Sequence, residues 1–260
     1  MALLWSGPGL ALDIQGALTP GGLIHVRLTP GASATLNGEA VPVGKDGLLV
    51  AGFGRDAKAE QVLTVTAPGG MTKRHLLTLK PRTYRIQRID GLPKKKVTPP
   101  KRDWDRIGRE AKLLNEARDA RSGRRDFLNG FVWPAKGRIS GVFGSQRVLN
   151  GKPRRPHAGV DIAAPTGTPV FAAASGVVAL THPGMFFAGK TVLIDHGHGV
   201  STIYIHLLEI AVKDGQAVKQ GQRIGRIGKT GRATGPHLHW GLAWGRVRLD
   251  PALLVGPMPE

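Results

Sequence analysis

Glycine-centred turns recur along the 260-residue chain and separate short, strand-like runs. Asn37-Gly38 and Asp46-Gly47 are typical of tight β-hairpin turns, because both positions of such turns favour positive φ angles. The chain holds 37 glycines and 19 prolines but only 5% aromatic residues. These features predict a mostly β protein of many short strands rather than one built from long helices.

Residues 1–90 are predicted to form a small β-sandwich. Strand-like runs cover residues 23–28, 61–66 and 72–79, with turn signals between them. Residues 35–43 resemble bacterial immunoglobulin-like modules. We therefore expect an immunoglobulin-like sandwich without catalytic residues, in which His25 and His75 are isolated histidines at the surface or on strand faces.

Residues 91–130 are predicted to be a basic linker that contains one helix. Residues 93–100 are rich in lysine and bounded by prolines. Asp103 is a candidate cap for a helix that runs to about Arg121. Apolar residues recur along this helix at spacings of three and four, which predicts one packed face and one charged face. These apolar residues are Trp104, Ile107, Ala111, Leu114 and Ala117. Docking between two domains is the favoured role of the helix, and phosphate binding is the alternative.

Positive charge is concentrated in the middle of the chain. The net charge is +19, and residues 80–155 contribute +15 of it, from 22 lysines and arginines against seven acids. Such a segment attracts an anionic polymer, or it is simply a solvated linker and helix surface. No nucleic-acid recognition module accompanies the charge, so an anionic envelope polymer is the preferred partner and nucleic acid is disfavoured.

Histidines cluster in the C-terminal region. Seven of the nine lie between positions 157 and 239. This clustering indicates a catalytic or metal-binding role, because imidazole titrates near neutral pH and binds metals. His157 and Asp161 are four residues apart, in a stretch that indicates a loop entering a strand. His237 and His239 are two apart and would share one face of a strand, and His206 lies in another strand-like run. Five candidates exceed the three ligands of an open zinc site, which leaves two for proton transfer and charge stabilisation.

Cysteine is absent, so a metal site must be built from His, Asp and Glu. No run of 18 or more apolar residues occurs, so no membrane span is expected. Residues 1–9 lack the basic and apolar regions of a secretory signal.

Four motifs, in family order, resemble those of the lysostaphin/LytM-type zinc endopeptidases, the M23 peptidases that cut peptide bridges in peptidoglycan. They are His157-x-Gly-Val-Asp161, Ile194-Asp-His-Gly-His-Gly199, Tyr204-Ile-His-Leu207 and Gly231-Arg-Ala-Thr-Gly-Pro-His-Leu-His-Trp240. The resemblance covers about residues 131–255 and implies that residues 131–260 form an antiparallel β catalytic domain of the LytM, or duplicated hybrid motif, type. Residues 212–225 resemble the turn-rich repeat of lipoyl and biotinyl carriers but lack the exposed lysine of a carrier hairpin, so they are assigned to the shared β-barrel framework.

The resemblance also implies how the five candidate residues divide the work. His157, Asp161 and His239 would hold Zn²⁺, and His237 and His206 would be the catalytic histidines. One of these two would accept a proton from water and pass it to the leaving amine, and the other would donate to the oxyanion. His237 is the preferred base because it lies one step along the strand face from ligand His239.

Two histidines and one further motif stay outside this set. His198 exceeds the family pattern and receives no role, and His196 is expected in a structural or substrate-proximal position. Gly228-Lys229-Thr230 suggests a phosphate-binding loop, but Arg223 stands where that loop needs its first glycine, so none is predicted.

The resemblance predicts a zinc metalloendopeptidase that hydrolyses peptide cross-links of peptidoglycan, with D-alanyl–meso-diaminopimelate bridges as the expected bonds. The alternative is a non-catalytic or latent LytM-type protein that regulates or activates another cell-wall hydrolase. The expected location is periplasmic or extracellular, with a signal peptide presumed to have been removed from this chain.

Overall fold

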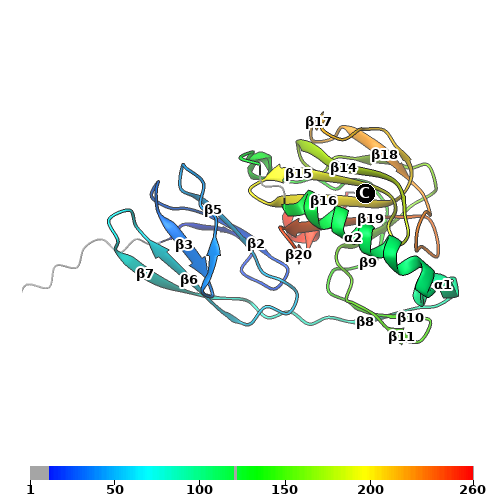
Figure 1. Ribbon diagram of the computed structural model, residues 1–260, viewed down its shortest axis with the longest axis horizontal. Helices are drawn as coiled ribbons and strands as arrows, with labels where there is room; N and C mark the ends of the chain where they lie inside the picture. Colours follow the sequence, from blue (N-terminus) through cyan, green and yellow to red (C-terminus); the bar gives the residue numbers. More distant parts are fainter. Residues whose placement is uncertain (1–11, 120–121, 260) are drawn as a thin grey trace, which may run out of the picture.

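The computed structural model describes residues 12–119 and 122–259, and Figure 1 confirms the expectation of a mostly β chain. The N-terminal part is a two-layer sandwich of antiparallel sheets with strand orders β1-β2-β5 and β4-β3-β6-β7. Its strands are β1 (Ile14–Gly16), β2 (Leu23–Arg27), β3 (Ser33–Leu36), β4 (Glu39–Val41), β5 (Leu48–Gly52), β6 (Glu60–Thr66) and β7 (Thr72–Thr78). Residues 1–9, considered above for a secretory signal, lie outside the described residues.

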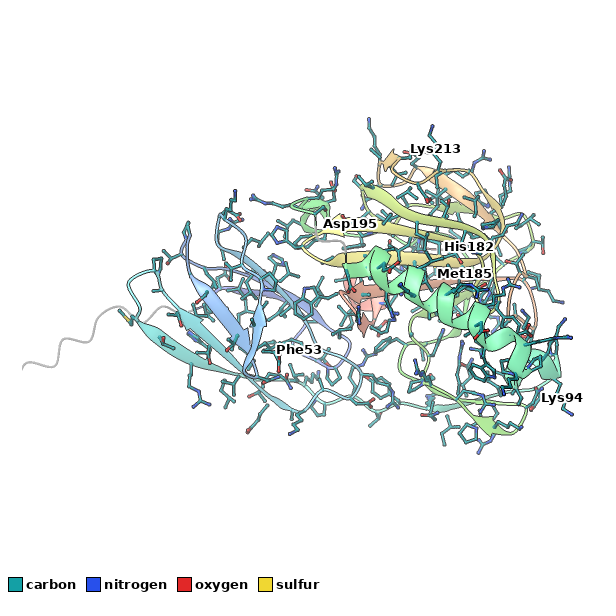
Figure 2. The ribbon with its side chains drawn as sticks, in the orientation of Figure 1. Phe53, Lys94, His182, Met185, Asp195 and Lys213 are labelled. Carbon is teal, nitrogen blue, oxygen red and sulfur yellow. The ribbon has the colours of Figure 1, made fainter. Side chains whose placement is uncertain are left out.

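Side chains from the two sheets of the sandwich meet in one hydrophobic core. In β2, Ile24 and Val26 are fully buried while His25 between them is only partly covered, which is the period-two pattern of a strand. Leu63 of β6 and Phe53, just after β5, belong to the same core (Figure 2). The two sheets agree with the expected sandwich, and its immunoglobulin-like character stays a prediction.

The segment that follows the sandwich is attached to the C-terminal part. β8 (Ile86–Ile89) pairs in parallel with β10 (Gln146–Leu149), which also pairs with β11 (Lys152–Pro153) in a small three-stranded sheet. Leu92, Leu149 and Val97 form a small apolar core beside it. The helices of this segment are α1 (Lys94–Val97), the 3₁₀ helix η1 (Lys101–Asp103), α2 (Trp104–Asp119) and the 3₁₀ helix η2 (Asp126–Asn129).

Helix α2 begins next to the expected cap, Asp103, and only part of the predicted stripe is covered. Ile107, Leu114 and Ala117 are half-buried. Trp104 is 55% exposed and Ala111 is also exposed, so the expected apolar stripe is wrong at both positions. The buried residues of the helix are Glu110 and Arg118. Apolar spacing does not identify these two charged residues, because a charged side chain can be buried where it finds hydrogen-bond partners. The Glu110 carboxylate accepts a hydrogen bond from the backbone N–H of Phe186 at 2.7 Å.

The C-terminal part is built on one ten-stranded sheet whose main path runs β17-β14-β15-β16-β19-β12-β9. β13 pairs with β18, which also pairs with β16, and β20 extends β19. The strands are β9 (Arg138–Gly141), β12 (Val160–Ala163), β13 (Pro169–Phe171), β14 (Gly176–Met185), β15 (Gly189–Gly197), β16 (Val200–Ile210), β17 (Ala217–Val218), β18 (Arg223–Ile227), β19 (His237–Trp244) and β20 (Val247–Leu249), followed by the 3₁₀ helix η3 (Pro251–Leu254). None of the helices in residues 12–119 and 122–259 has the length and apolar character needed to cross a membrane.

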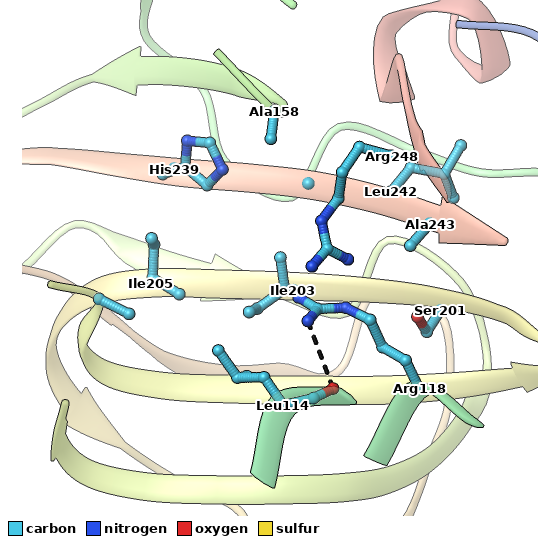
Figure 3. A pocket seen from close by; sticks show the side chains of 12 residues that line it. Leu114, Arg118, Ala158, Ser201, Ile203, Ile205, His239, Leu242, Ala243 and Arg248 are labelled. Carbon is cyan, nitrogen blue, oxygen red and sulfur yellow. Dashed lines mark hydrogen bonds between the residues drawn. The ribbon is translucent and has the colours of Figure 1, made fainter. Parts of the chain in front are cut away.

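The two faces of the central strands have different roles. Tyr204 of β16 and Trp240 of β19 are paired in register, and both are fully buried in the main hydrophobic core on one face. Their neighbours, such as the pair Ile205 and His239, therefore lie on the opposite face. Helix α2 crosses the sheet on this opposite face, where Leu114 lines a cavity together with Ile205 and His239 (Figures 1 and 3).

Candidate active site

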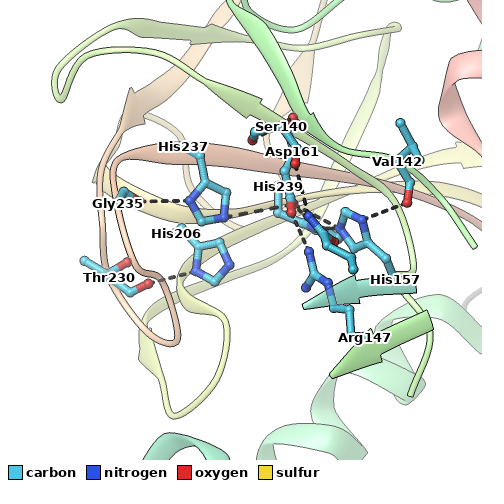
Figure 4. A network of polar contacts seen from close by, with 11 residues as sticks. Ser140, Val142, Arg147, His157, Asp161, His206, Thr230, Gly235, His237 and His239 are labelled. Atoms are coloured by element: carbon cyan, nitrogen blue, oxygen red, sulfur yellow. Dashed lines mark hydrogen bonds and ion pairs between the residues drawn. The ribbon is translucent and has the colours of Figure 1, made fainter. Parts of the chain in front are cut away.

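His157, Asp161 and His239 converge on one point of the sheet. Asp161 on β12 is paired in register with His239 on β19, and His157 lies in the loop that leads into β12. Asp161 Oδ1 lies 2.8 Å from Nδ1 of His239 and 3.0 Å from Nε2 of His157, and these two nitrogens are 2.9 Å apart (Figure 4). Ligand atoms held about 2 Å from a zinc ion lie about 3.3 Å from one another, so this donor set fits a tetrahedral metal after a small expansion.

Contacts outside the cluster orient its members. The Nδ1 of His157 lies 3.1 Å from the carbonyl oxygen of Val142, so this nitrogen is the donor and Nε2 turns its lone pair toward the cluster. Arg147 on β10 donates from its Nη2 to Oδ2 of Asp161. Oδ1 is then the carboxylate oxygen that faces both histidines. The role of Arg147 could not be predicted from the sequence, because a single arginine in a strand-like stretch belongs to no motif.

The close packing of strands at this point explains the glycine of the first motif. Gly159 lies against β19, and a Cβ atom there would be 2.3 Å from the carbonyl oxygen of Trp240 and 2.9 Å from Nε2 of His239. Both distances are too short for a real carbon atom. Glycine at this position therefore allows the two ligand-bearing segments to approach each other.

His206 and His237 lie beside the cluster and face each other, with ring centroids 4.7 Å apart. The Nδ1 of His206 is 2.8 Å from the carbonyl oxygen of Thr230, and the Nδ1 of His237 is 2.9 Å from that of Gly235. Carbonyl oxygens only accept, so both Nδ1 atoms donate and both Nε2 atoms carry free lone pairs. The Nε2 of His237 is 4.0 Å from Oδ1 of Asp161, at the edge of the cluster.

The backbone at His206 is strained, with a φ angle of 65°. This left-handed region is uncommon for residues other than glycine, and such strain often marks a functional site. A hydrogen bond from the backbone N–H of His206 to the carbonyl of Ala188, 2.9 Å long, holds the conformation. The strain bends the chain within β16, where the pairing with β18 also shifts register beyond Leu207.

Burial and mutual charge set the protonation of the site. Burial, reinforced by His237 and His239, lowers the pKa of His206 to about 3. Burial also lowers the pKa of His239 to about 4, against the opposing effect of Asp161. Burial alone would raise the pKa of Asp161, but its contacts with His157 and His239 hold that pKa well below its ordinary value. The cluster therefore pairs the Asp161 carboxylate with a neutral His239 imidazole, and these are the protonation states that a divalent metal requires of its ligands.

A cavity of about 310 Å³ opens beside these residues and is lined by Asp161, His206 and His237. Its other walls come from β8 and β10 and from the loop before β19, which contributes Arg232. The segment that follows the sandwich thus forms part of the wall of the candidate active site through β8 and Leu92, a role that sequence spacing gave no means to predict.

The two remaining histidines of the second motif lie apart from this cluster. His196 is fully buried, with Nδ1 2.6 Å from the carbonyl of Ser175 and Nε2 2.7 Å from the hydroxyl of Thr202. Of the two expected positions, it occupies the structural one. His198 contacts the ring of Phe127, with centroids 6.0 Å apart, at the side of the sheet nearer the sandwich.

A carboxylate and two imidazoles converge on one point as a group that could hold a metal ion, and two further imidazoles lie beside them. Residues 155–251 match the family model of Peptidase family M23. The crystal structure of a putative peptidase M23 from Pseudomonas aeruginosa is 32% identical in sequence, covers 91% of this chain and 94% of that chain, and has a TM-score of 0.71. The chain belongs to peptidase family M23.

Two curated relatives are more similar over shorter stretches. Peptidoglycan DD-endopeptidase ShyA of Vibrio cholerae is 50% identical over 111 residues, which is 42% of this chain and 25% of that protein. DD-carboxypeptidase/endopeptidase Mpg of Neisseria meningitidis is 40% identical over 124 residues, which is 47% of this chain and 28% of that protein. The chain thus spans about a quarter of the length of these relatives.

Proposed function

We propose that this protein is a zinc-dependent endopeptidase that hydrolyses peptide cross-links of peptidoglycan. The observation that carries the proposal is the convergence of Asp161 Oδ1 with a nitrogen from each of His157 and His239, with His206 and His237 beside them. A closed structural zinc site would use four protein ligands, whereas three ligands leave a position for water or substrate. The name of ShyA, a peptidoglycan DD-endopeptidase, supports the same substrate, and the name of Mpg, a DD-carboxypeptidase/endopeptidase, supports the same kind of reaction.

The chain's own residues would divide the reaction as follows. His157, Asp161 and His239 would hold the zinc ion, which when bound activates water and polarises the scissile carbonyl. His237 would accept the proton of the attacking water at Nε2 and transfer it to the leaving amine. His206 would donate a hydrogen bond to the developing oxyanion from its Nε2 after taking up a proton there, while its Nδ1 keeps the hydrogen bond to Thr230. The carbonyl contacts at both Nδ1 atoms keep the two rings aimed at the same space.

The expected bond is the D-alanyl–meso-diaminopimelate cross-link, and the expected location is the cell envelope. Support for both comes from the relatives ShyA, a peptidoglycan DD-endopeptidase, and Mpg, a DD-carboxypeptidase/endopeptidase. Contact between residues 80–155 and an anionic envelope polymer stays a prediction. Part of that charge faces inward, because Arg118 is buried and Arg147 binds Asp161, so exposed residues such as Lys94 and Lys95 would make the contact. Charge reversal at these two lysines should weaken binding to an anionic polymer at low salt.

The experiment that tests the function combines metal content and turnover. The purified chain should bind one zinc ion and release soluble peptides from purified peptidoglycan, with loss of activity in a chelator and recovery with zinc. Analysis of the released fragments would identify the bond that is cut. A folded chain that binds no zinc, or that binds zinc and cuts no peptidoglycan, would contradict the proposal and leave the regulatory alternative.

A further inference from the structure

A second cavity, of about 170 Å³, adjoins the metal cluster on the face crossed by α2. His239 forms one end of its lining, and the side chains of Ile203 and Ile205 form much of its apolar floor (Figure 3). At the other end stand two arginines, Arg118 from α2 and Arg248 from β20, whose guanidinium groups lie side by side. The catalytic roles proposed above use neither arginine.

Arg118 is buried and Arg248 is half-buried, and neither has an anionic partner among the described residues. Arg118 is 4% exposed, and its Nη1 donates only to the carbonyl of Leu114 in its own helix, at 3.3 Å. The Nη1 of Arg248 is buried and has no hydrogen-bond partner among the described residues. Within residues 12–119 and 122–259, no carboxylate forms an ion pair with either guanidinium. Two like charges buried side by side destabilise the fold unless a counter-charge lies between them.

A third unsatisfied group lines the same cavity. Ser201 of β16 is 4% exposed, and its hydroxyl has no hydrogen-bond partner. It is paired in register with Ala243, which is paired in turn with Arg248, so Ser201 and Arg248 lie in one row across the sheet. Figure 3 shows Ser201 at the same end of the cavity as the two arginines. Buried polar atoms are nearly always hydrogen-bonded in folded proteins, so unpartnered donors that line one cavity indicate a missing acceptor.

Electrostatics agree with this geometry. Burial, together with the charge of Arg248, lowers the pKa of Arg118 to about 9, and burial lowers that of Arg248 to about 10. Both groups are still protonated at neutral pH, so the cavity contains two positive charges in a largely apolar lining.

We propose that Arg118, Arg248 and Ser201 form a carboxylate-binding subsite for the peptide substrate, next to the metal centre. This inference rests on the proposed function for the identity of the ligand, but the anion site itself does not. Guanidinium groups bind planar carboxylates through paired hydrogen bonds, and the serine hydroxyl supplies one more donor. Diaminopimelate carries a carboxylate on each of its amino-acid centres, so a cross-link presents such a group close to the bond that is cut. Helix α2, outside the stretch matched by the family model, would thus contribute Arg118 to substrate recognition.

A binding experiment tests the anion site without requiring catalysis. Propionate is titrated into the full zinc-loaded chain, and the side-chain N–H signals of Arg118 and Arg248 are followed by NMR. Propionamide is the uncharged analogue, and inorganic phosphate is the second anion. Propionate should shift both signals in a saturable manner and propionamide should not. The shift should disappear in R248Q. Absence of a saturable shift, an unchanged shift in R248Q, or a response to phosphate alone would overturn the carboxylate site.

A second experiment tests the link to substrate. Synthetic cross-linked peptides with free carboxylates are compared with the same peptides in amidated form. The wild type should cleave the free form about 10–100-fold more efficiently, because a hydrogen-bonded charge pair of this kind contributes roughly 1.5–3 kcal/mol. R248Q and S201A should lose most of this preference, and R248K should retain part of it. Equal preference in wild type and R248Q would overturn the subsite.

The matched control is R246Q, because Arg246 stands two residues away and its Nη2 is 2.5 Å from Asp119 of α2 rather than in the cavity. It should keep both the propionate shifts and the preference for free carboxylates. Thermal melting of each variant excludes loss of fold. If neither the wild type nor any variant cleaves either peptide, the proposed function fails. The propionate titration then still shows whether the anion site exists.

Discussion

The rings of His206 and His237 face each other at 4.7 Å, with their planes inclined by 51°, and each is tied to a backbone carbonyl through Nδ1. The two residues come from neighbouring parts of one sheet but from different strands, β16 and β19. This pairing leaves two free Nε2 atoms beside a three-residue metal cluster. It is the arrangement expected when proton transfer and charge stabilisation are separate tasks.

Replacement of either histidine by alanine should reduce turnover on peptidoglycan by about 10²–10⁴-fold while zinc content stays near one ion per chain. Soluble peptide release and metal analysis measure the two quantities on the same sample. His75→Ala is the control, because His75 lies on β7 in the sandwich and should leave both unchanged. A His206 or His237 variant with turnover near that of wild type would remove that residue from the mechanism.

Arg147 should tune metal affinity through Asp161. Its guanidinium holds Oδ2 of Asp161 and so keeps Oδ1 directed at the histidines. Arg147→Ala should weaken zinc binding by about 10–100-fold, and Arg147→Lys should restore part of the loss. Competition with a chromogenic chelator measures the affinity. Arg138→Ala is a suitable control, because Arg138 lines the same cavity without a recorded contact to Asp161. Equal affinities for Arg147→Ala and wild type would contradict this role.

Metal-free protein should lose stability as the pH falls below 6.5. The pKa of His206 is lowered to about 3 and that of His239 to about 4, from an ordinary value of 6.5. Between these values and 6.5 the unfolded chain binds protons that the folded chain does not, so the free energy of unfolding decreases as pH decreases. The slope is about 1.4 kcal/mol per pH unit for each such group.

Urea denaturation in a chelator at pH 7, 6 and 5 measures this slope. His206→Gln removes one titrating group and should make the slope shallower. The same slope in wild type and His206→Gln would show that protonation of His206 does not control acid stability.

Glu110 should anchor helix α2. Its Oε1 accepts from Nε of Arg106 at 2.7 Å, and its Oε2 accepts from the backbone N–H of Phe186 at 2.7 Å. Glu110→Ala leaves a buried donor unsatisfied and should lower the free energy of unfolding by about 1–3 kcal/mol. Glu116→Ala, on an exposed part of the same helix with a loose 3.8 Å contact to Lys112, should change it by less than about 0.5 kcal/mol. Urea melts compare the two. Similar effects for both variants would show that the Phe186 contact does not hold the helix.

Much of the architecture could be predicted from the sequence because it depends on local signals. Short strands and glycine turns follow from backbone preferences, so the mostly β fold and the two-sheet sandwich could be predicted from the sequence. The period-two pattern also placed His237 and His239 on one strand face. The apolar stripe of α2 was wrong at Trp104 and Ala111, because local spacing cannot show that the carboxylate of Glu110 finds a buried partner 76 residues away.

The sequence by itself determined which residue types could hold a metal and move a proton. The imidazoles of His157 and His239 and the carboxylate of Asp161 can bind a metal because of their own chemical groups, wherever the chain places them. Only the tertiary structure decided that Arg147 would orient Asp161 and that Arg118 of α2 would meet Arg248 of β20 in a cavity beside His239. The reason is physical. A ligand's chemistry belongs to its side chain, whereas the partner of a buried charge is set by strand register and helix docking between segments far apart in the chain.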